Sequence, residues 1–190
     1  RSMLNWYDYI DSKSPIYGSV SGSIPGSGSA TFSEASHQTY TSWDVESFNT
    51  WVPTGWNADW DWVRRSSGGW SGGYAQFSYG FTTQGDLVSK SYSTGHANRV
   101  YLEFYYKTSY FGGTLKIYAY DWYGNWDLIM DCSPHNFWYQ ATWSSTDYQY
   151  LHGDFKVRYE ATVSDSQFVG VDEHRIRTRY YCKKFNHQFA

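Results

Sequence analysis

Apolar and polar residues alternate through the middle of the chain, most regularly in residues 98–122. In the first run, one side carries Val100, Leu102, Phe104 and Tyr106. After the Gly112-Gly113 pair, a second run carries Leu115, Ile117 and Ala119 on one side. Period-two alternation on both sides of a glycine turn is typical of an antiparallel hairpin with one buried and one solvent-facing side. The sequence therefore predicts a hairpin here, with the other strands added around it.

Similar short runs, separated by Gly, Pro, Asn and Asp clusters, recur along most of the chain. They predict strands near residues 40–48, 60–65, 74–81, 87–92, 100–107, 115–120, 126–130, 138–143, 155–161 and 170–181. No segment keeps a 3.6-residue period, which would indicate a helix. Many short strands with regular turn spacing predict an all-β protein, a two-sheet antiparallel jelly-roll β-sandwich.

The first 36 residues differ in composition from the predicted sandwich of residues 37–190. They begin with an aromatic segment that contains Leu4, Trp6, Tyr7, Tyr9 and Ile10. Residues 11–36 are rich in Gly, Ser and Pro, as a flexible linker is. This N-terminal arm either wraps around its own domain or donates its first strand to the sheet of a neighbouring subunit.

Aromatic residues make up 22% of the chain, with 11 Trp and 20 Tyr. The core must therefore be filled largely by rings, and some rings must also lie outside. Trp60 and Trp62 share one side of a predicted strand, and we expect both in the core. Alternation places Tyr101 and Tyr105 on the outside too, but the outer rings expected to bind a ligand or a partner are Tyr118, Tyr120, Trp122, Tyr123 and Trp126, of which the last three flank the Gly124-Asn125 turn. Exposed flat rings suit stacking on sugars or burial at an interface, although Tyr is also simply a good strand former.

The formal net charge of −3 argues against a nucleic-acid binder held by phosphate neutralisation. No apolar run approaches the roughly 18 residues that a membrane-spanning helix needs. The charge is uneven, however, because residues 173–190 carry +4 and the remainder carries −7. This basic end either meets an acidic surface of a neighbouring subunit or is simply a solvated face.

The chain has two cysteines, Cys132 and Cys182. A disulfide between them would close a loop of about 50 residues and stabilise the fold by roughly 4 kcal/mol in the chain-entropy model. That bond is the pairing we expect, and it indicates an oxidising, extracytoplasmic setting. The alternatives are two free buried thiols, or a zinc site that also uses His135 and His187.

Three stretches resemble a known family: SFNTWVPTGWNADWDWVRRSSG, GDLVSKSYSTGHANRVYLEFYYKTSYFGGTLKIYAYD and VGVDEHRIRTRYY. They are similar to MAM-type and related concanavalin-like jelly-roll domains. The chain departs from animal MAM domains in lacking their cysteine pattern, and Asn49 stands where an acid is usual. The resemblance implies a non-catalytic module of a secreted or cell-surface protein, in adhesion, assembly or glycan binding. It also implies a structural calcium near the first and last strands, with Asp44, Glu46 and Asp172 as its ligands.

Catalytic motifs are missing from the sequence: it has no G-x-S-x-G elbow, no H-E-x-x-H helix and no phosphate loop. The closest acid pairs, Asp59 with Asp61 and Asp44 with Glu46, could in principle serve glycoside hydrolysis. The prediction is a non-catalytic, extracellular structural or adhesion subunit that assembles with itself, as a fibre or surface layer, through its N-terminal arm. The alternatives are a carbohydrate-binding module that uses the exposed Trp and Tyr loops and, less favoured, a glycosidase or lyase.

Overall fold

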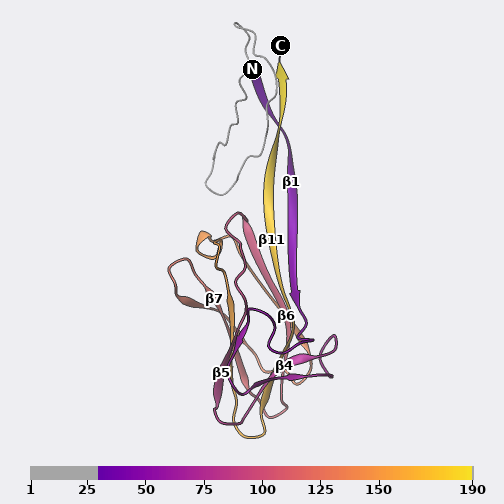
Figure 1. Ribbon diagram of the computed structural model, residues 1–190, viewed down its shortest axis with the longest axis vertical. Coiled ribbons are helices and arrows are strands. Elements are labelled where there is room, and N and C mark those ends of the chain that lie inside the picture. Colours follow the sequence, from indigo (N-terminus) through magenta and orange to yellow (C-terminus); the bar gives the residue numbers. More distant parts are fainter. Residues whose placement is uncertain (1–29, 190) are drawn as a thin grey trace.

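The computed structural model describes the backbone of residues 30–189 and the side chains of residues 44–180. It shows a two-layer β body from which a long two-stranded ribbon extends (Figure 1). The predicted all-β, two-sheet antiparallel sandwich is confirmed. Within the described residues, no helix has the length and apolar character required to cross a membrane.

Both sheets are antiparallel. The six-stranded sheet has the order β3 (Trp62–Arg65), β4 (Tyr74–Ser78), β11 (Phe168–Phe189), β6 (Arg99–Thr108) and β9 (Tyr139–Ser145), with β1 (Ala30–Glu46) also paired to β11. The five-stranded sheet has the order β2 (Asn57–Ala58), β5 (Gln84–Val88), β10 (Val157–Thr162), β7 (Thr114–Tyr120) and β8 (Trp126–Cys132). A single 3-10 turn, η1 (Tyr148–Tyr150), lies between β9 and β10.

The hairpin predicted for residues 98–122 is wrong, although its two strands exist. β6 pairs with β11 and β9, whereas β7 pairs with β10 and β8, so the two strands belong to opposite sheets. Gly112 and Gly113, with φ angles of 107° and 113°, carry the chain from one layer to the other. The alternation indicated correctly which side of each strand is buried, but two strands that face each other across a sandwich show the same pattern as two strands that pair side by side.

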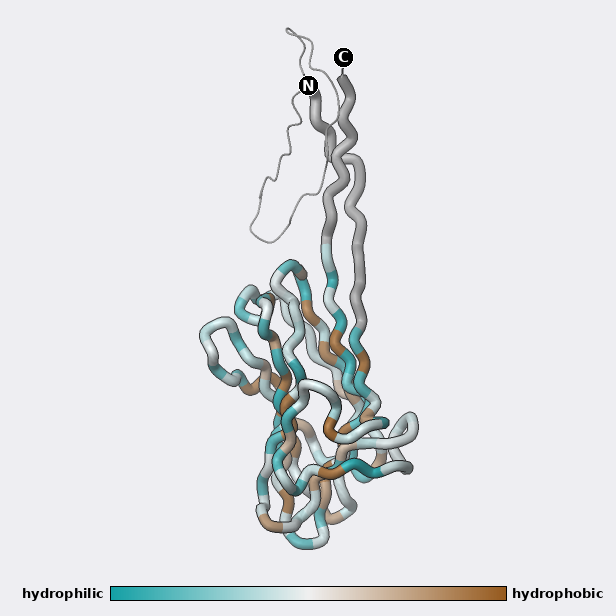
Figure 2. The backbone as a smooth tube through the Cα atoms, in the orientation of Figure 1, coloured by the Kyte–Doolittle hydropathy of each residue, from teal (hydrophilic) through white to brown (hydrophobic). Residues whose placement is uncertain are grey.

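The core is the space between the sheets, filled by alternate residues from both. From β6 and β7 it receives Val100, Leu102, Phe104, Tyr106, Leu115, Ile117 and Ala119, each at most 2% exposed. Apolar positions accordingly recur along the strands of the body (Figure 2). Burial of such side chains contributes roughly 25 cal/mol per Å² of apolar surface and is the main favourable term in folding.

Trp60 and Trp62 do not share the core. Trp62 is 2% exposed and packs against Phe77, but Trp60 is 95% exposed. The backbone N–H of Trp62 donates to the backbone carbonyl of Asp59 (3.0 Å), so residues 59–62 form a turn and β3 begins only at Trp62. The alternation used to place both tryptophans on one side does not hold in a turn.

β1 and β11 continue together beyond the body. Their register runs from Glu46 opposite His174 to Ala30 opposite Phe189. The pairing of β11 with β6 ends much earlier, at Arg179 opposite Arg99. The two strands therefore leave the body side by side as a ribbon (Figure 1). β1 begins ten residues before the strand predicted to start at residue 40.

The expected disulfide is not formed. Cys132 is a free thiol, 6% exposed, on the core side of β8, and burial raises its pKa to about 12. Cys182 lies opposite Gln38 in the ribbon, three residues past the last pair of β11 with β6. The two cysteines belong to different sheets, and one of them lies outside the body, which the spacing between them along the chain does not reveal.

A buried histidine links the two layers. His174 is fully buried on β11; its Nε2 lies 2.9 Å from the Tyr92 hydroxyl and its Nδ1 2.5 Å from the Tyr159 hydroxyl. In the neutral ring one nitrogen donates and the other accepts, so both hydrogen bonds are satisfied without a charge. Burial, with a smaller effect from the positive charge of Lys90, lowers the pKa of His174 to about 3.

We therefore predict that acid destabilises the fold through His174. Because its pKa is lower in the folded chain than in the unfolded chain, the unfolded state binds an extra proton below about pH 6.5, and stability is lost as the pH falls toward 3. Chemical denaturation between pH 6 and 4 should show a loss of up to about 1.4 kcal/mol per pH unit that His174→Gln removes. The exposed His96→Gln is the control. Equal pH slopes for the wild type and His174→Gln would contradict the prediction.

Candidate functional site

Three of the five predicted outer aromatics lie together on the outer face of the five-stranded sheet. Tyr118 and Tyr120 project from β7, and Trp126 of β8 lies opposite Tyr120, with ring centroids 5.0 Å apart. The Arg158 guanidinium, from β10, lies 4.2 Å from the Tyr118 ring centroid and 5.1 Å from that of Trp126. These three rings are half-buried, and each is already in contact with a cation of the same chain, since Lys156 lies 5.0 Å from the Tyr120 ring centroid.

Carboxylates balance the charge of Arg158. Its guanidinium lies 3.5 Å from Asp86 and 3.8 Å from Glu160, and the Tyr118 hydroxyl donates to Glu160 (3.3 Å). Burial raises the pKa of Asp86, which Arg158 partly offsets. In this part of the face, the rings and charged side chains therefore contact one another and support the sheet.

The turn after β7 is fixed by a buried carboxylate. Asp121 is 4% exposed and accepts hydrogen bonds from the backbone N–H (2.7 Å) and the side-chain amide (3.2 Å) of Asn125. Burial acts to raise the pKa of Asp121, but these bonds and those from the backbone of Tyr123 and Gly124 outweigh it, so its pKa lies below the ordinary value. Gly124 has a φ of 89°, a conformation that side chains with a Cβ rarely adopt.

This turn presents two bare rings to solvent. Trp122 and Tyr123 are each 64% exposed, far more than the three rings on the sheet. The backbone N–H of Trp122 donates to the Gln149 carbonyl (2.8 Å), and the Trp122 ring contacts His152 edge-on. The Tyr123 hydroxyl lies 2.7 Å from the hydroxyl of Tyr148, the first residue of η1. The backbone that carries the exposed rings is therefore fixed both by Asp121 and by the hydrogen bond to Gln149.

The predicted aromatic set is thus one region with two parts. Tyr118, Tyr120 and Trp126 form its supporting part, and Trp122 and Tyr123 its open part; Tyr148, which sequence reasoning did not select, joins the open part. Tyr148 follows Asp147, the N-cap of η1, and no alternation marks a residue in such a turn. Its position beside Tyr123 depends on the η1 turn.

A second aromatic cluster, missed by the sequence reasoning, lies on the outer face of the other sheet. There the loop between β3 and β4 folds over β6, with Trp70 stacked on Tyr105 at 4.4 Å. Lys107 lies 4.7 Å from the ring centroid of Trp138, and both side chains donate to the Gly68 carbonyl. Tyr105 and Lys107 share the polar side of β6, but no pattern in the sequence indicates that the loop covers them. These contacts anchor the loop.

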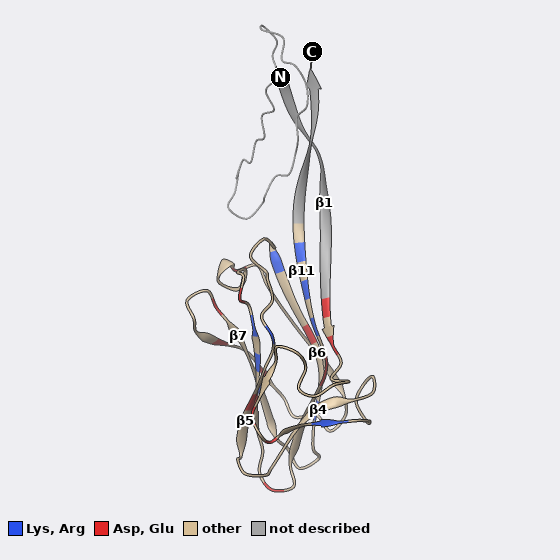
Figure 3. Ribbon diagram, viewed as in Figure 1, with Lys and Arg blue, Asp and Glu red and all other residues tan. Residues whose placement is uncertain are grey.

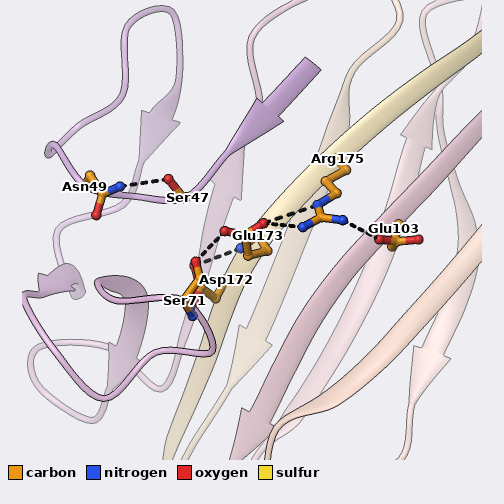
Figure 4. A network of polar contacts seen from close by, with 7 residues as sticks. All are labelled: Ser47, Asn49, Ser71, Glu103, Asp172, Glu173 and Arg175. Carbon is orange, nitrogen blue, oxygen red and sulfur yellow. Dashed lines mark hydrogen bonds and ion pairs between the residues drawn. The ribbon is translucent and has the colours of Figure 1, made fainter. Parts of the chain in front are cut away.

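Next to that cluster, the acids of β11 are held by protein groups (Figure 4). Asp172 accepts from the backbone N–H of Ser71 (3.1 Å) and of Glu173 (2.8 Å). Glu173 accepts from the Ser71 hydroxyl and from Arg175, which also donates to Glu103 (3.1 Å). Burial raises the pKa of Asp172; for Glu173, the bonds from Ser71 and Arg175 outweigh burial and lower the pKa.

Each of the three predicted calcium ligands has a protein partner. Asp44 forms an ion pair with Lys90 (2.8 Å), Glu46 accepts from the Phe48 N–H (2.7 Å), and Asp172 lies in the network above. Within the part of the chain that the structure describes, no group of three or more His, Cys, Asp or Glu is placed to hold a metal ion. Calcium binding by these three residues stays a prediction.

The acid pair at the start of β3 organises turns. Asp59 accepts from the Asp86 N–H (2.7 Å), and Asp61 accepts from the N–H and the hydroxyl of Thr82 (2.8 and 2.9 Å). These hydrogen bonds connect loops on the edge of the body and lower the pKa of Asp61. The predicted arm residues Leu4, Trp6, Tyr7, Tyr9 and Ile10 lie outside the described residues.

No protein-family model and no curated protein matches the chain. Its fold is similar to solved structures. The CBM22-1 xylan-binding domain of Paenibacillus barcinonensis Xyn10C aligns with a TM-score of 0.52 at 18% identity, over 70% of this chain and 92% of that one. The K1 cleaved adhesin domain of Lys-gingipain from Porphyromonas gingivalis W83 aligns with the same score and identity, over 71% and 97%.

At this identity the likeness establishes the fold alone. The tandem CBM22-1–CBM22-2 domain of the same Xyn10C gives a TM-score of 0.52 at 18% identity, over 70% of this chain and 43% of that one. The neighbours are β-sandwich domains of carbohydrate-binding and adhesin proteins. The specific resemblance to MAM domains is not confirmed.

We predict that Gly124→Ala loosens the exposed turn. A Cβ at a φ of 89° costs about 1–2 kcal/mol, and the variant should lose about that much unfolding free energy, measured by chemical denaturation. Gly153→Ala is the matched control, because a Cβ there meets nothing within 4 Å. Equal stability of the two variants would contradict this account of the turn.

Proposed function

We propose that this protein is a non-catalytic carbohydrate-binding module that acts outside the cell and stacks sugar rings on Trp122 and Tyr123. The observation that carries the proposal is the exposure of these two rings on a turn fixed by Asp121. A flat aromatic side chain that is already ordered binds a sugar face at little cost in conformational entropy. The fold similarity to a xylan-binding domain supports the same class of ligand.

Polar groups beside the rings suit sugar hydroxyls. The Tyr123 and Tyr148 hydroxyls lie at the edge of the exposed rings and can both donate and accept. Asp127, in contrast, already accepts from the Tyr150 hydroxyl (3.0 Å), and Asp121 is held by Asn125. The nearest carboxylates therefore hold the protein together, and the proposed role is binding without bond cleavage.

Self-assembly through the N-terminal arm is the second candidate function. The observation that favours it is the β1–β11 ribbon, which extends from the body (Figure 1) and whose outer edges have no strand partner within residues 30–189. The arm itself lies outside the described residues. Assembly and glycan binding use different parts of the molecule.

Binding to a panel of polysaccharides, including xylan, tests the main proposal by affinity electrophoresis. We expect at least one polysaccharide to retard the wild type, with no release of reducing sugar. Trp122→Ala should bind that polysaccharide about ten-fold more weakly, which is equivalent to about 1.4 kcal/mol of binding free energy. Trp60→Ala is the control: Trp60 is 95% exposed but follows β2, at the opposite edge of the sheet from β8. Absence of binding to every polysaccharide, or equal loss in both variants, would overturn the proposal.

A further inference from the structure

The ribbon has two strand edges without a strand partner among residues 30–189. β1 pairs with β11 along one edge, and no other described strand pairs with its second edge. β11 is flanked by β6 up to Arg179 opposite Arg99, and beyond this point the edge that faced β6 has no strand partner among the described residues; we call it the open edge. Residues 180–189 of β11 therefore continue past the end of β6 with one side unpaired within residues 30–189.

The backbone geometry identifies the groups on that open edge. The Arg179 carbonyl points to the β6 side, where it accepts from the Asn98 N–H (2.9 Å). Because the N–H and C=O of one residue in an antiparallel strand point the same way and alternate along the strand, residue 183 presents both groups to the same edge. A third strand at this place would lie in line with β6 and extend the six-stranded sheet along the ribbon.

Two paired strands alone are marginally stable in water, whereas three or more can form a stable sheet. The open stretch of ten residues spans about 33 Å. Exposed edges of this length bind other strands by β-strand addition. The open edge of the ribbon thus has room for a further strand of about ten residues.

The sequence before β1 supplies a strand of that length. Residues 1–10 contain six large apolar or aromatic side chains, Met3, Leu4, Trp6, Tyr7, Tyr9 and Ile10, and 19 residues separate them from Ala30 at the end of the ribbon. Residues 1–10 contain one basic and one acidic residue, Arg1 and Asp8, and residues 180–189 contain Lys183 and Lys184 and no acid. Figure 3 shows the described basic residues of this end along β11, up to the point where the open edge begins. The segment therefore matches the open stretch in length and has no net positive charge to oppose it.

We propose that the open edge of β11 beyond Arg179 binds the N-terminal segment of a second copy of this chain, as an added antiparallel strand. Each chain has two open ribbon edges but one such segment, so its own segment can cover only one of them. If each copy gives its segment to the next, the contact is head-to-tail and builds rings or filaments; if two copies exchange segments, it closes a dimer.

The test uses two variants of the full chain. Lys183→Pro removes the N–H on the open edge while the bonds to β1 remain, because proline is tolerated where a strand faces solvent. Lys183→Ala removes the same charge but keeps the N–H, and is the matched control. Proline at both Trp6 and Tyr7 removes a donor from the segment in either register, since neighbouring N–H groups point to opposite sides.

Light scattering coupled to size-exclusion chromatography gives the readout. We expect the wild type and Lys183→Ala to form species of at least twice the chain mass, and each proline variant to be monomeric. An equimolar mixture of the two proline variants should form a one-to-one dimer, because one keeps the acceptor edge and the other keeps the donor segment. Polysaccharide retardation should be unchanged in all of them, which separates this proposal from the binding proposal.

Three outcomes would overturn the inference. A wild type that is monomeric at millimolar concentration would show that the segment binds its own ribbon or no ribbon. Assembly of Lys183→Pro equal to that of Lys183→Ala would place the contact elsewhere. Failure of the two proline variants to combine would exclude a segment-to-edge contact between copies.

Discussion

The backbone hydrogen bonds of β11 are the constraint on which the rest of the structure depends. Every strand in a sandwich must pair sideways while it buries alternate side chains against the other sheet. Among the described strands, β11 pairs with β4 and β6 in its first part, with β1 and β6 in the middle, and with β1 alone at its end. It also carries His174 into the core, where two tyrosines from the other layer bind it. The strand therefore joins the two sheets of the body and carries that body into the ribbon.

Aromatic residues serve three separate purposes in this chain, and their exposure distinguishes them. Inside the body, rings such as Phe104 and Tyr159 pack edge-on and fill much of the core of a chain in which leucine is scarce. On the outer faces, rings pair with cations of the same chain, as Tyr118 does with Arg158. A ring whose face is already covered by a guanidinium offers little to a ligand. Only rings such as Trp122, ordered but uncovered, combine rigidity with an available face.

The sequence predicted the fold class and the buried side of most strands, because alternation records burial directly. It could not predict partners: β6 and β7 show the pattern of a hairpin, yet face each other across the core. Alternation also failed at Trp60, where a turn interrupts the strand, and spacing failed for Cys132 and Cys182, which lie in different sheets. The aromatic site was found by its glycine turn, but the covering of Tyr118 by Arg158 depends on β10 lying next to β7, a tertiary contact.

The two proposed surfaces belong to different sheets, and this separation has a consequence for binding. The exposed turn lies beside β8, an edge strand of the five-stranded sheet, whereas the ribbon extends from the six-stranded sheet. Strand addition at the ribbon would leave the turn open on every copy. A single site built from two stacking rings binds a sugar weakly, but many sites on one assembly bind a polymer through a high effective concentration. Head-to-tail assembly would thus convert a weak aromatic site into a strong attachment to polysaccharide without any new contact to sugar.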